Sequence, residues 1–274
     1  MGLENEFVIR LGVFLGVFVV LALMEHVLPR RKIDEIKARR WLTNWALSFV
    51  NILALRLVAL ALSFLAIGAA VDAHANGFGI LNAFEAPTWI TWVVTILALD
   101  FAIWVQHVVT HKVPLLWRLH QVHHADTEMD VTTAIRFHPI EIGLSMTLKV
   151  GLIYLLGPPA AAVLLFEVLL NGSAMFNHAN IRLPLWLDRV LRRVIVTPDM
   201  HRVHHSIDRR EHDSNYGFFL SIWDHMFSTH VAQPRLPHET MPIGLRWQDR
   251  RPSGLRWSLL LPFQNPKKTD VSKS

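Results

Sequence analysis

Long apolar stretches limit what this chain can fold into more than any other feature of its sequence. Residues 11–28 form a block long enough to cross a bilayer as a helix, and two further blocks cover about 41–71 and 89–106. Two more, 140–157 and 158–176, meet at the helix-breaking sequence Gly-Pro-Pro. Because such blocks are too long for the core of a soluble protein, the sequence predicts an all-α, multi-spanning helical membrane protein.

The composition narrows the chemistry that is open to the protein. Among its 274 residues there is no cysteine, which excludes disulfides, thiolate metal ligands and cysteine-held iron–sulfur clusters. Any metal must therefore be held by histidine, carboxylate or amide groups. The net charge is +5, but the Lys and Arg residues lie beside the apolar blocks, as they do at the ends of membrane helices. The charge therefore does not indicate a nucleic-acid partner.

The same basic residues predict an orientation in the membrane. The segment 30–40 carries six Lys and Arg residues, whereas the loop 72–88 has two acidic residues and no Lys or Arg. Under the positive-inside rule the N-terminus faces away from the cytoplasm, and 140–176 is a hairpin that enters and leaves on the cytoplasmic side. The histidine motifs described below and the basic C-terminal tail are then cytoplasmic. The sequence leaves open whether the hairpin re-enters or crosses fully.

Two segments near these blocks need separate interpretation. A removable signal peptide at 11–28 is disfavoured, because no basic segment precedes the block and no small-residue cleavage site follows it. The segment 183–196 places Arg residues at helical spacing among apolar ones. It predicts an amphipathic interfacial helix whose basic face meets lipid headgroups.

Three histidine motifs carry the chemical signal of the sequence: HVVTH (107–111), HQVHH (120–124) and HRVHH (201–205). On a helix, residues three or four positions apart lie on one face, so each motif offers at least two imidazoles to a metal. Eight imidazoles are too many for one ion but suit two, and the adjacent pairs can serve neighbouring ions. The eight are His107, His111, His120, His123, His124, His201, His204 and His205. Nitrogen ligation suits Fe, Zn, Cu or Ni, so it does not fix the metal.

Other histidines are candidates because of their position. His138 directly precedes the hairpin, His178 directly follows it, and His212 follows the third motif, so each is a possible further ligand or neighbour of the site. The remaining histidines are isolated in sequence, and we expect them to be ordinary hydrogen-bonded or solvated side chains. These are His26, His74, His225, His230 and His238.

Several polar residues lie beside the motifs. Asp126, Glu128 and Asp130 either accept a ring N–H from a ligand histidine or are solvated loop acids. Asp199 lies two residues before His201, which favours the orienting role. Asn215 is either an amide ligand or, more commonly for the sequence SNYG, a turn former.

Four ionisable residues fall within or near membrane depth: Glu25, Arg56, Asp100 and Glu167. Such groups are costly in hydrocarbon, so we expect them to face the interior of the bundle. Arg56 is a candidate partner of Asp100 or Glu167 near a substrate channel. A structural ion pair or a snorkelling arginine is the favoured alternative.

Three segments resemble the bacterial members of the sterol desaturase/fatty acid hydroxylase superfamily. They are WRLHQVHHADTEMDVTTAIRFHPIE (117–141), VTPDMHRVHHS (196–206) and NYGFFLSIWDHMFSTH (215–230). The resemblance covers about 95–232 and includes all three histidine motifs around a hydrophobic hairpin. One departure is His225–Met226 followed by Ser228, where Arg–Leu and Gly are usual; this puts the local loop shape or a partner contact in doubt.

The resemblance implies both the organisation and the activity of the protein. The implied parts are N-terminal transmembrane helices with a basic cytoplasmic loop (1–94), a catalytic domain (95–232) and a cytoplasmic C-terminal tail (233–274). The eight motif histidines would bind two Fe ions, with His178 as the family's additional histidine. The centre would activate O₂ to hydroxylate or desaturate a C–H bond of a sterol, fatty acyl or related lipid in a bacterial inner membrane. Since the chain has no cytochrome b5-like segment, a separate ferredoxin- or cytochrome-type donor would supply the electrons.

Two other classes of function remain open on the sequence. A histidine-rich membrane metal transporter would need ligands along a path at the membrane midplane, whereas the motifs fall at helix ends. A zinc-binding structural or hydrolytic protein would use the same nitrogens without O₂ chemistry, and zinc can also replace iron during expression. The basic residues of 182–210 either attract an acidic redox partner or anionic lipid, or reflect topology alone.

Overall fold

The computed structural model describes residues 5–33, 37–62, 65–84, 86–247 and 254–264. Across these residues the secondary structure is helical, and pairing of extended backbone is limited to isolated bridges such as Pro29 with Ile181. The predicted all-α class is confirmed.

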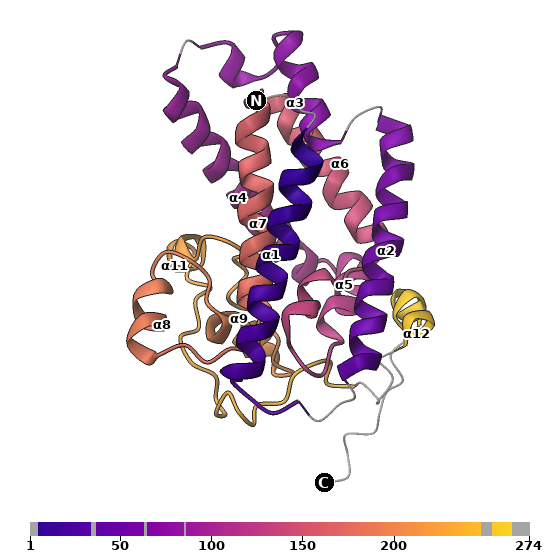
Figure 1. Cartoon of the computed structure of the whole chain (residues 1–274), viewed down its shortest axis with the longest axis vertical. Coiled ribbons are helices and arrows are strands. Elements are labelled where there is room, and N and C mark those ends of the chain that lie inside the picture. The colour runs from indigo at the N-terminus through magenta and orange to yellow at the C-terminus, as the bar shows by residue number, and fades with distance from the viewer. Residues whose placement is uncertain (1–4, 34–36, 63–64, 85, 248–253, 265–274) are drawn as a thin grey trace.

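Long apolar helices form the body of the molecule, and Figure 1 shows them running side by side along its longest axis. Five stretches of helix are long and apolar enough to cross a membrane. They are α1 (Glu6–Val27), α2 (Lys37–Leu62) followed by α3 (Ala66–Ala75), α4 (Thr88–Lys112), α6 (Pro139–Leu156) and α7 (Ala160–His178).

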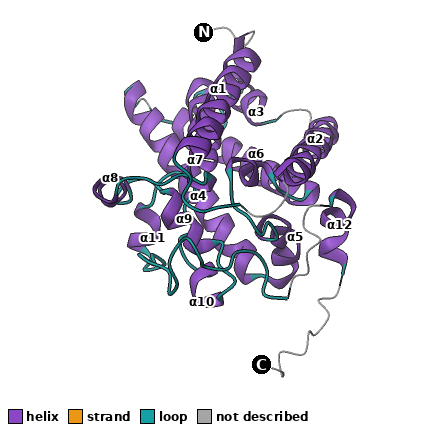
Figure 2. Ribbon diagram, turned by 60° about the horizontal axis from the view of Figure 1, so that its bottom comes forward, coloured by secondary structure: helices purple, strands orange, loops and turns teal. Residues whose placement is uncertain are grey.

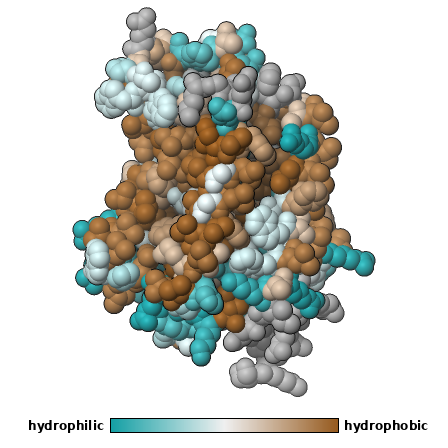
Figure 3. Space-filling model, in the orientation of Figure 1, coloured by the Kyte–Doolittle hydropathy of each residue, from teal (hydrophilic) through white to brown (hydrophobic). Residues whose placement is uncertain are grey.

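The outer faces of these helices are apolar. Leu57 and Leu60 on α2 are 68% and 82% exposed, and Phe7 on α1 is 71% exposed. The space-filling view shows hydrophobic residues covering the middle of the molecule, with polar residues gathered toward its two ends (Figure 3). A soluble protein rarely exposes so much contiguous apolar surface, whereas a bilayer covers it. The protein is therefore an integral membrane protein.

The hairpin of α6 and α7 reaches the loop that joins α3 to α4. Its tip is Gly157, which ends α6 in the left-handed conformation at φ +65°, followed by two prolines. A Cβ on Gly79, in the loop between α3 and α4, would lie 2.2 Å from the Gly157 nitrogen, so the two loops touch backbone to backbone. The Tyr154 hydroxyl also donates to Asp72 at the end of α3, at 2.7 Å. Because the tip reaches the end where α3 and α4 are joined, this geometry favours two full crossings.

Shorter helices cover the opposite end of the bundle (Figure 2). Their bounds are α5 (Pro114–His124), α8 (Leu185–Leu191), α9 (Pro198–His204), α10 (Arg209–His212), α11 (Ile222–Met226) and α12 (Leu255–Leu260), with the 3-10 turns η3 (Val131–Ile135) and η4 (Leu261–Phe263). A further 3-10 turn, η2 (Ile80–Asn82), lies in the loop between α3 and α4. The amphipathic helix predicted over 183–196 is shorter than expected: α8 ends at Leu191, and after a turn Ile195 forms a bridge with Leu220. Within α8, Leu185 and Trp186 lie on the surface beside the exposed Arg189, as an interfacial helix requires.

The buried cores join distant parts of the sequence. One joins Ala69 and Ala70 on α3 to Phe166 on α7, and another joins Leu47 on α2 to Leu261 near the C-terminus. Hydrophobic packing therefore crosses residues 94 and 232, the two predicted domain boundaries. The division at these residues stays a prediction from sequence.

Candidate metal centre

The three histidine motifs lie on separate helices that meet at one end of the bundle. The first occupies the last turns of α4, the second ends α5, and the third forms α9 with His205 as its C-cap. Both short helices begin at a proline, Pro114 and Pro198, whose fixed φ suits the first helical position. Val113 is extended between α4 and α5, which folds α5 back against α4.

The structure gathers the nine histidines into two groups, and all nine are buried. Within each group, one possible ligand atom per residue lies within 4.8 Å of all the others. The five-histidine group is His107, His111, His120, His124 and His204; the four-histidine group is His123, His178, His201 and His205. Neighbours in sequence diverge, because His123 and His124 enter different groups, as do His204 and His205. His178 completes the second group although it lies outside the motifs.

For five of the nine histidines, a hydrogen bond fixes which ring nitrogen faces the centre of its group. The Nδ1 atoms of five histidines bond to acceptors: His107 to Tyr216 O (2.6 Å), His178 to Ala174 O (2.6 Å), His204 to Ser214 O (2.7 Å), His123 to Arg136 O (3.2 Å) and His120 to a carboxylate oxygen of Glu141 (2.6 Å). Since these acceptors have no proton to donate, each Nδ1 must carry the hydrogen. Each of these neutral rings therefore presents an unprotonated Nε2, the atom through which this tautomer binds a metal.

The positions of the Nε2 atoms fit a bound cation. Nε2 of His107 lies 3.0 Å from Nε2 of His120, and the same distance separates His123 and His178. With both Nδ1 atoms protonated, each pair brings two lone pairs face to face, which is repulsive unless a positive charge lies beside them. Burial, reinforced by the neighbouring imidazoles, lowers the pKa of His123 well below its ordinary value of 6.5, so a proton is a poor candidate at neutral pH. The donor set fits nitrogen-ligated transition-metal ions.

The comparison with known protein families agrees with this geometry. Residues 92–229, about half of the chain, match the model of the family described as fatty acid hydroxylase. The chain belongs to the fatty acid hydroxylase family. The matched segment contains all nine histidines of the two groups. The resemblance seen in the sequence is therefore confirmed.

Similar proteins include several enzymes named for lipid oxidation. The chain is 31% identical over 148 residues to alkylglycerol monooxygenase of Xenopus tropicalis, covering 52% of this chain and 31% of the relative. It is 29% identical over 182 residues to ornithine lipid hydroxylase OlsE of Rhizobium tropici, covering 65% of this chain and 52% of the relative. A cholesterol 25-hydroxylase-like protein of Danio rerio is 27% identical over 140 residues, covering 49% and 53%. The aligned segment thus spans about a third to a half of these relatives' lengths, and no solved structure matches the chain.

Glu141 contacts one of these histidines, although the sequence did not point to it. It lies in the first turn of α6 and holds His120 through the short Nδ1 bond described above. In the same segment, RFHPIE, the sequence indicated His138 as a possible ligand. His138 belongs to neither histidine group. Instead, His138 caps α6 by accepting from Ile140 N (3.2 Å) and contacts Leu259 O through Nε2 (3.2 Å).

Asp199 and Asn215 do not have the predicted roles as ligand or orienting group. Asp199 pairs with Arg30 at 3.0 Å and with Arg202 at 2.5 Å, and its carboxylate binds neither ring nitrogen of His201. The Asn215 amide donates to Met200 O (3.0 Å) and Val231 O (2.9 Å), so it joins two loops, consistent with the turn-forming alternative.

The acids after the second motif are buried and serve the fold. Asp126 and Asp130 each accept from the guanidinium of Arg40 at 2.9 Å, and Arg40 also donates to the backbone carbonyl of Glu128. These acids are thus neither solvated nor bound to a histidine. They fix the loop that leads to Arg136, whose carbonyl accepts from His123.

His212 lies beside the five-histidine group. It forms a possible third metal group with His111 and Asp213, and its ring stacks on Trp117 with centroids 5.4 Å apart. Trp117 in turn lies 5.0 Å from the ring of His111. These residues and His124 line a depression of about 220 Å³ rimmed by the exposed side chains of Arg209 and Arg246.

The acids at membrane depth each have a partner other than Arg56. Glu25 accepts from the backbone of Val131 and Asn180, Asp100 accepts from Trp223 Nε1 at 2.8 Å, and Glu167 pairs with Lys149 at 2.9 Å. Arg56 is exposed on α2, so the suggested pairing with Asp100 or Glu167 is wrong.

A buried carboxylate, Asp224, organises the loop that orients His107. Its oxygens accept from Trp104 Nε1 (3.1 Å), Tyr216 N (2.9 Å) and Gly217 N (2.9 Å). The carbonyl of Tyr216 is the group that binds His107. The sequence reading missed Asp224 because its partners lie up to 120 residues away.

Ser228 is the position where the loop departs from the family pattern, and its backbone is left-handed, at φ +57°. A side chain in this region costs roughly 1–2 kcal/mol relative to glycine. We therefore expect Ser228→Gly to stabilise the protein by about 1 kcal/mol, seen as a higher midpoint of thermal unfolding in detergent. Ser228→Ala keeps the Cβ and is the matched control. Equal stabilisation by both changes would contradict the backbone explanation.

Proposed function

We propose that the protein is a membrane-bound di-iron oxygenase that hydroxylates or desaturates a C–H bond of a lipid. The observation that carries the proposal is the pair of buried histidine groups whose unprotonated Nε2 atoms converge. Two similar proteins, named alkylglycerol monooxygenase and ornithine lipid hydroxylase, support a lipid substrate. Alkylglycerols and ornithine lipids are accordingly the first substrates to test.

The metal and the protein would have different roles in the reaction. Hydroxylation converts R–H, O₂, two electrons and two protons into R–OH and water, and bound iron would supply the redox chemistry that side chains lack. The five-histidine and four-histidine groups would each hold one ion. Glu141 and the carbonyls of Tyr216, Ala174, Ser214 and Arg136 would keep the imidazoles in the binding tautomer.

Separate openings would serve the substrate and the electrons. A cavity of about 240 Å³ and an apolar groove of about 600 Å³ reach the site from among the long helices, and both are lined by Glu141. The depression at Trp117 and His212 approaches the five-histidine group from the other side. Its rim residues Arg209 and Arg246 would attract an acidic ferredoxin- or cytochrome-type donor. In a bacterium this face would be cytoplasmic and the membrane the inner one.

Two alternatives use the same histidines. A metal transporter needs ligands along a path through the membrane, whereas these histidines gather in two adjoining groups at the ends of α4, α5, α7 and α9. A zinc-binding protein without oxygenase activity would satisfy the same donors.

Lipid products test the proposal directly. In cells expressing the protein and fed 1-O-hexadecylglycerol or ornithine lipid, we expect lipids that gain one oxygen or lose two hydrogens, measured by mass spectrometry under ¹⁸O₂. The gained oxygen should carry the label, because O₂ is its source. Cells expressing His123→Ala should lack these products. Products equal in both strains would contradict an oxygenase at this site.

A further inference from the structure

Three ionisable side chains meet inside the membrane-spanning part of the bundle. Glu167 on α7 pairs with Lys149 on α6 (Nζ–Oε1 2.9 Å) and with Arg10 on α1 (3.2 Å). The side chain of Glu167 is 3% exposed and that of Lys149 is 11% exposed. Charges are expensive at membrane depth, and well-packed apolar residues often replace a buried ion pair without loss of stability. The fold alone therefore does not account for this cluster.

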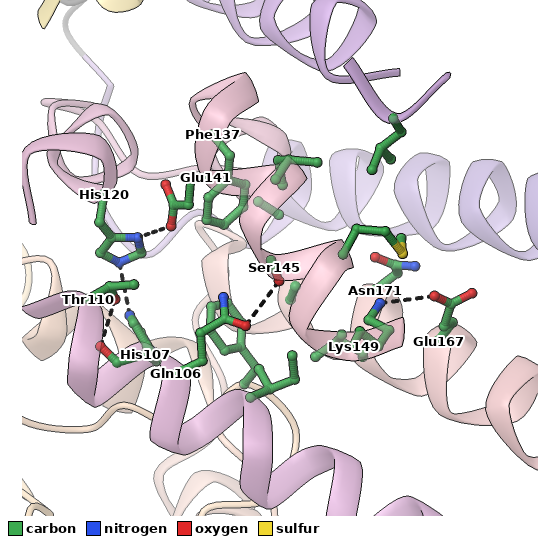
Figure 4. A pocket seen from close by; sticks show the side chains of 18 of the residues that line it. Gln106, His107, Thr110, His120, Phe137, Glu141, Ser145, Lys149, Glu167 and Asn171 are labelled. Atoms are coloured by element: carbon green, nitrogen blue, oxygen red, sulfur yellow. Dashed lines mark hydrogen bonds and ion pairs between the residues drawn. The ribbon is translucent and has the colours of Figure 1, made fainter. Parts of the chain in front are cut away.

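The charged cluster shares one cavity with the metal site. The cavity of about 240 Å³ is lined by Arg10, Lys149 and Glu167, and also by His107 and His120. In Figure 4 the pair of Lys149 and Glu167 lies at one side of the cavity and the pair of His107 and His120 at the other. The cavity therefore has an ionic end and a metal end.

The spacing of residues on α6 measures the distance between these ends. Glu141, Ser145 and Lys149 follow one another at intervals of four and all line the cavity. At 1.5 Å per residue, Lys149 lies about 12 Å along the helix from Glu141, the residue that holds His120.

An apolar groove adjoins the cavity beside the metal site. It measures about 600 Å³, lies between α4, α5 and α6, and is lined mainly by apolar side chains such as Phe101, Val105 and Leu148. Groove and cavity share four lining residues: Gln106, Thr110, Glu141 and Ser145. Gln106 accepts a hydrogen bond from the Ser145 hydroxyl at 3.1 Å, so this contact crosses from α4 to α6 where the two spaces meet.

We propose that the cavity binds the zwitterionic headgroup of a lipid whose acyl chain lies in the groove. The cations Lys149 and Arg10 would receive the headgroup's anionic oxygens, and Glu167 would receive its ammonium. Lys149 has three N–H donors, and its bond to Glu167 uses one of them. The carbon nearest the metal end is then the one where headgroup and chain join. This inference rests on the proposed function and deepens it, by naming the class of lipid and the region attacked.

Equilibrium binding tests the inference without requiring turnover. The full chain in detergent micelles is titrated by native mass spectrometry with N-hexadecanoylornithine, which is zwitterionic, and with 1-O-hexadecylglycerol, which has a neutral headgroup on a chain of equal length. We expect the zwitterionic probe to bind at least about tenfold more tightly. Free ornithine, which cannot fill the groove, should not displace it. Equal affinity for both lipids, or displacement by free ornithine, would overturn the proposal.

Variants locate the binding to the charged cluster. Lys149→Met and Glu167→Gln should each weaken binding of the zwitterionic probe at least about tenfold and leave the neutral probe unaffected. Lys32→Met, at an exposed lysine away from the cavity, is the matched control. The double change Lys149→Met/Glu167→Leu replaces the pair by apolar residues and preserves folding if a single variant is unstable. Unchanged affinity of the double variant for the zwitterionic probe would contradict the proposal.

The outcomes separate this inference from the proposed function. Binding is measured whatever metal the protein holds. An inactive protein that still prefers the zwitterionic probe would contradict the proposed oxygenase activity and support the headgroup site. A protein that makes labelled products but binds both probes equally would contradict the headgroup site and support the oxygenase activity.

Discussion

Replacing His123 or His204 with alanine is expected to deplete the protein of iron. His123 belongs to the four-histidine group and His204 to the five-histidine group, and both residues are fully buried. We expect about two Fe per chain in protein purified anaerobically from iron-supplemented cells, one for each group. Each substitution should weaken metal binding by at least about tenfold, because even loss of a residue that merely orients a ligand costs that much. Both ions should be affected, since α5 and α9 each supply ligands to both groups.

Elemental analysis with Mössbauer spectroscopy measures this effect. His74→Ala is the matched control, because His74 lies outside both groups and bonds to Asn82 in the loop after α3. Iron content that is indifferent to His123→Ala and His204→Ala would break the proposed mechanism. Zinc in aerobically purified protein would not decide the matter, since zinc binds the same nitrogens. Spectra of the iron-loaded protein distinguish a coupled pair of ions from two separate ones.

Replacing Arg40 with leucine is expected to destabilise the protein by about 3–5 kcal/mol. The Arg40 side chain is 2% exposed and pairs with Asp126 and Asp130, so the change removes the guanidinium that these two buried carboxylates share. Chemical denaturation in detergent, followed by circular dichroism, measures the loss. Iron content should fall as well, because the same loop leads to Arg136, whose carbonyl holds His123.

The neighbouring arginine provides the control. Arg39 is exposed on the same turn of α2, so Arg39→Leu should change the free energy of unfolding by no more than about 0.5 kcal/mol. If Arg39→Leu and Arg40→Leu proved equally stable, the ion pairs with Asp126 and Asp130 would not hold the loop.

The comparison of His138 with His178 shows what sequence position alone misses. Both flank the hairpin, and both were expected at the same end of the molecule. His178 ends α7 with Nε2 3.0 Å from that of His123, whereas His138 begins α6 and uses its ring to cap that helix. The difference lies in the direction of each side chain, which follows from how the two helices pack.

The residues that orient the histidines and the loops around them could not be predicted from the sequence, because each contacts a residue far away in the chain. Glu141 is 21 positions from His120, Arg40 is 86 from Asp126, and Asp224 is 120 from Trp104. No local periodicity or spacing links residues so far apart. Their roles exist only once the helices have assembled.

The sequence by itself determined the helical class, the apolar crossings and the three histidine motifs. A bilayer requires each spanning segment to satisfy its backbone hydrogen bonds internally, so apolar length is enough to predict a helix. Helical spacing likewise puts the imidazoles of one motif on one face. Tertiary structure alone decided how adjacent histidines divide between two groups, which nitrogen of five of the rings faces the centre, and that Lys149 and Glu167 share a cavity with His107. Those outcomes depend on contacts between helices distant in sequence, and the packing of the whole bundle sets them.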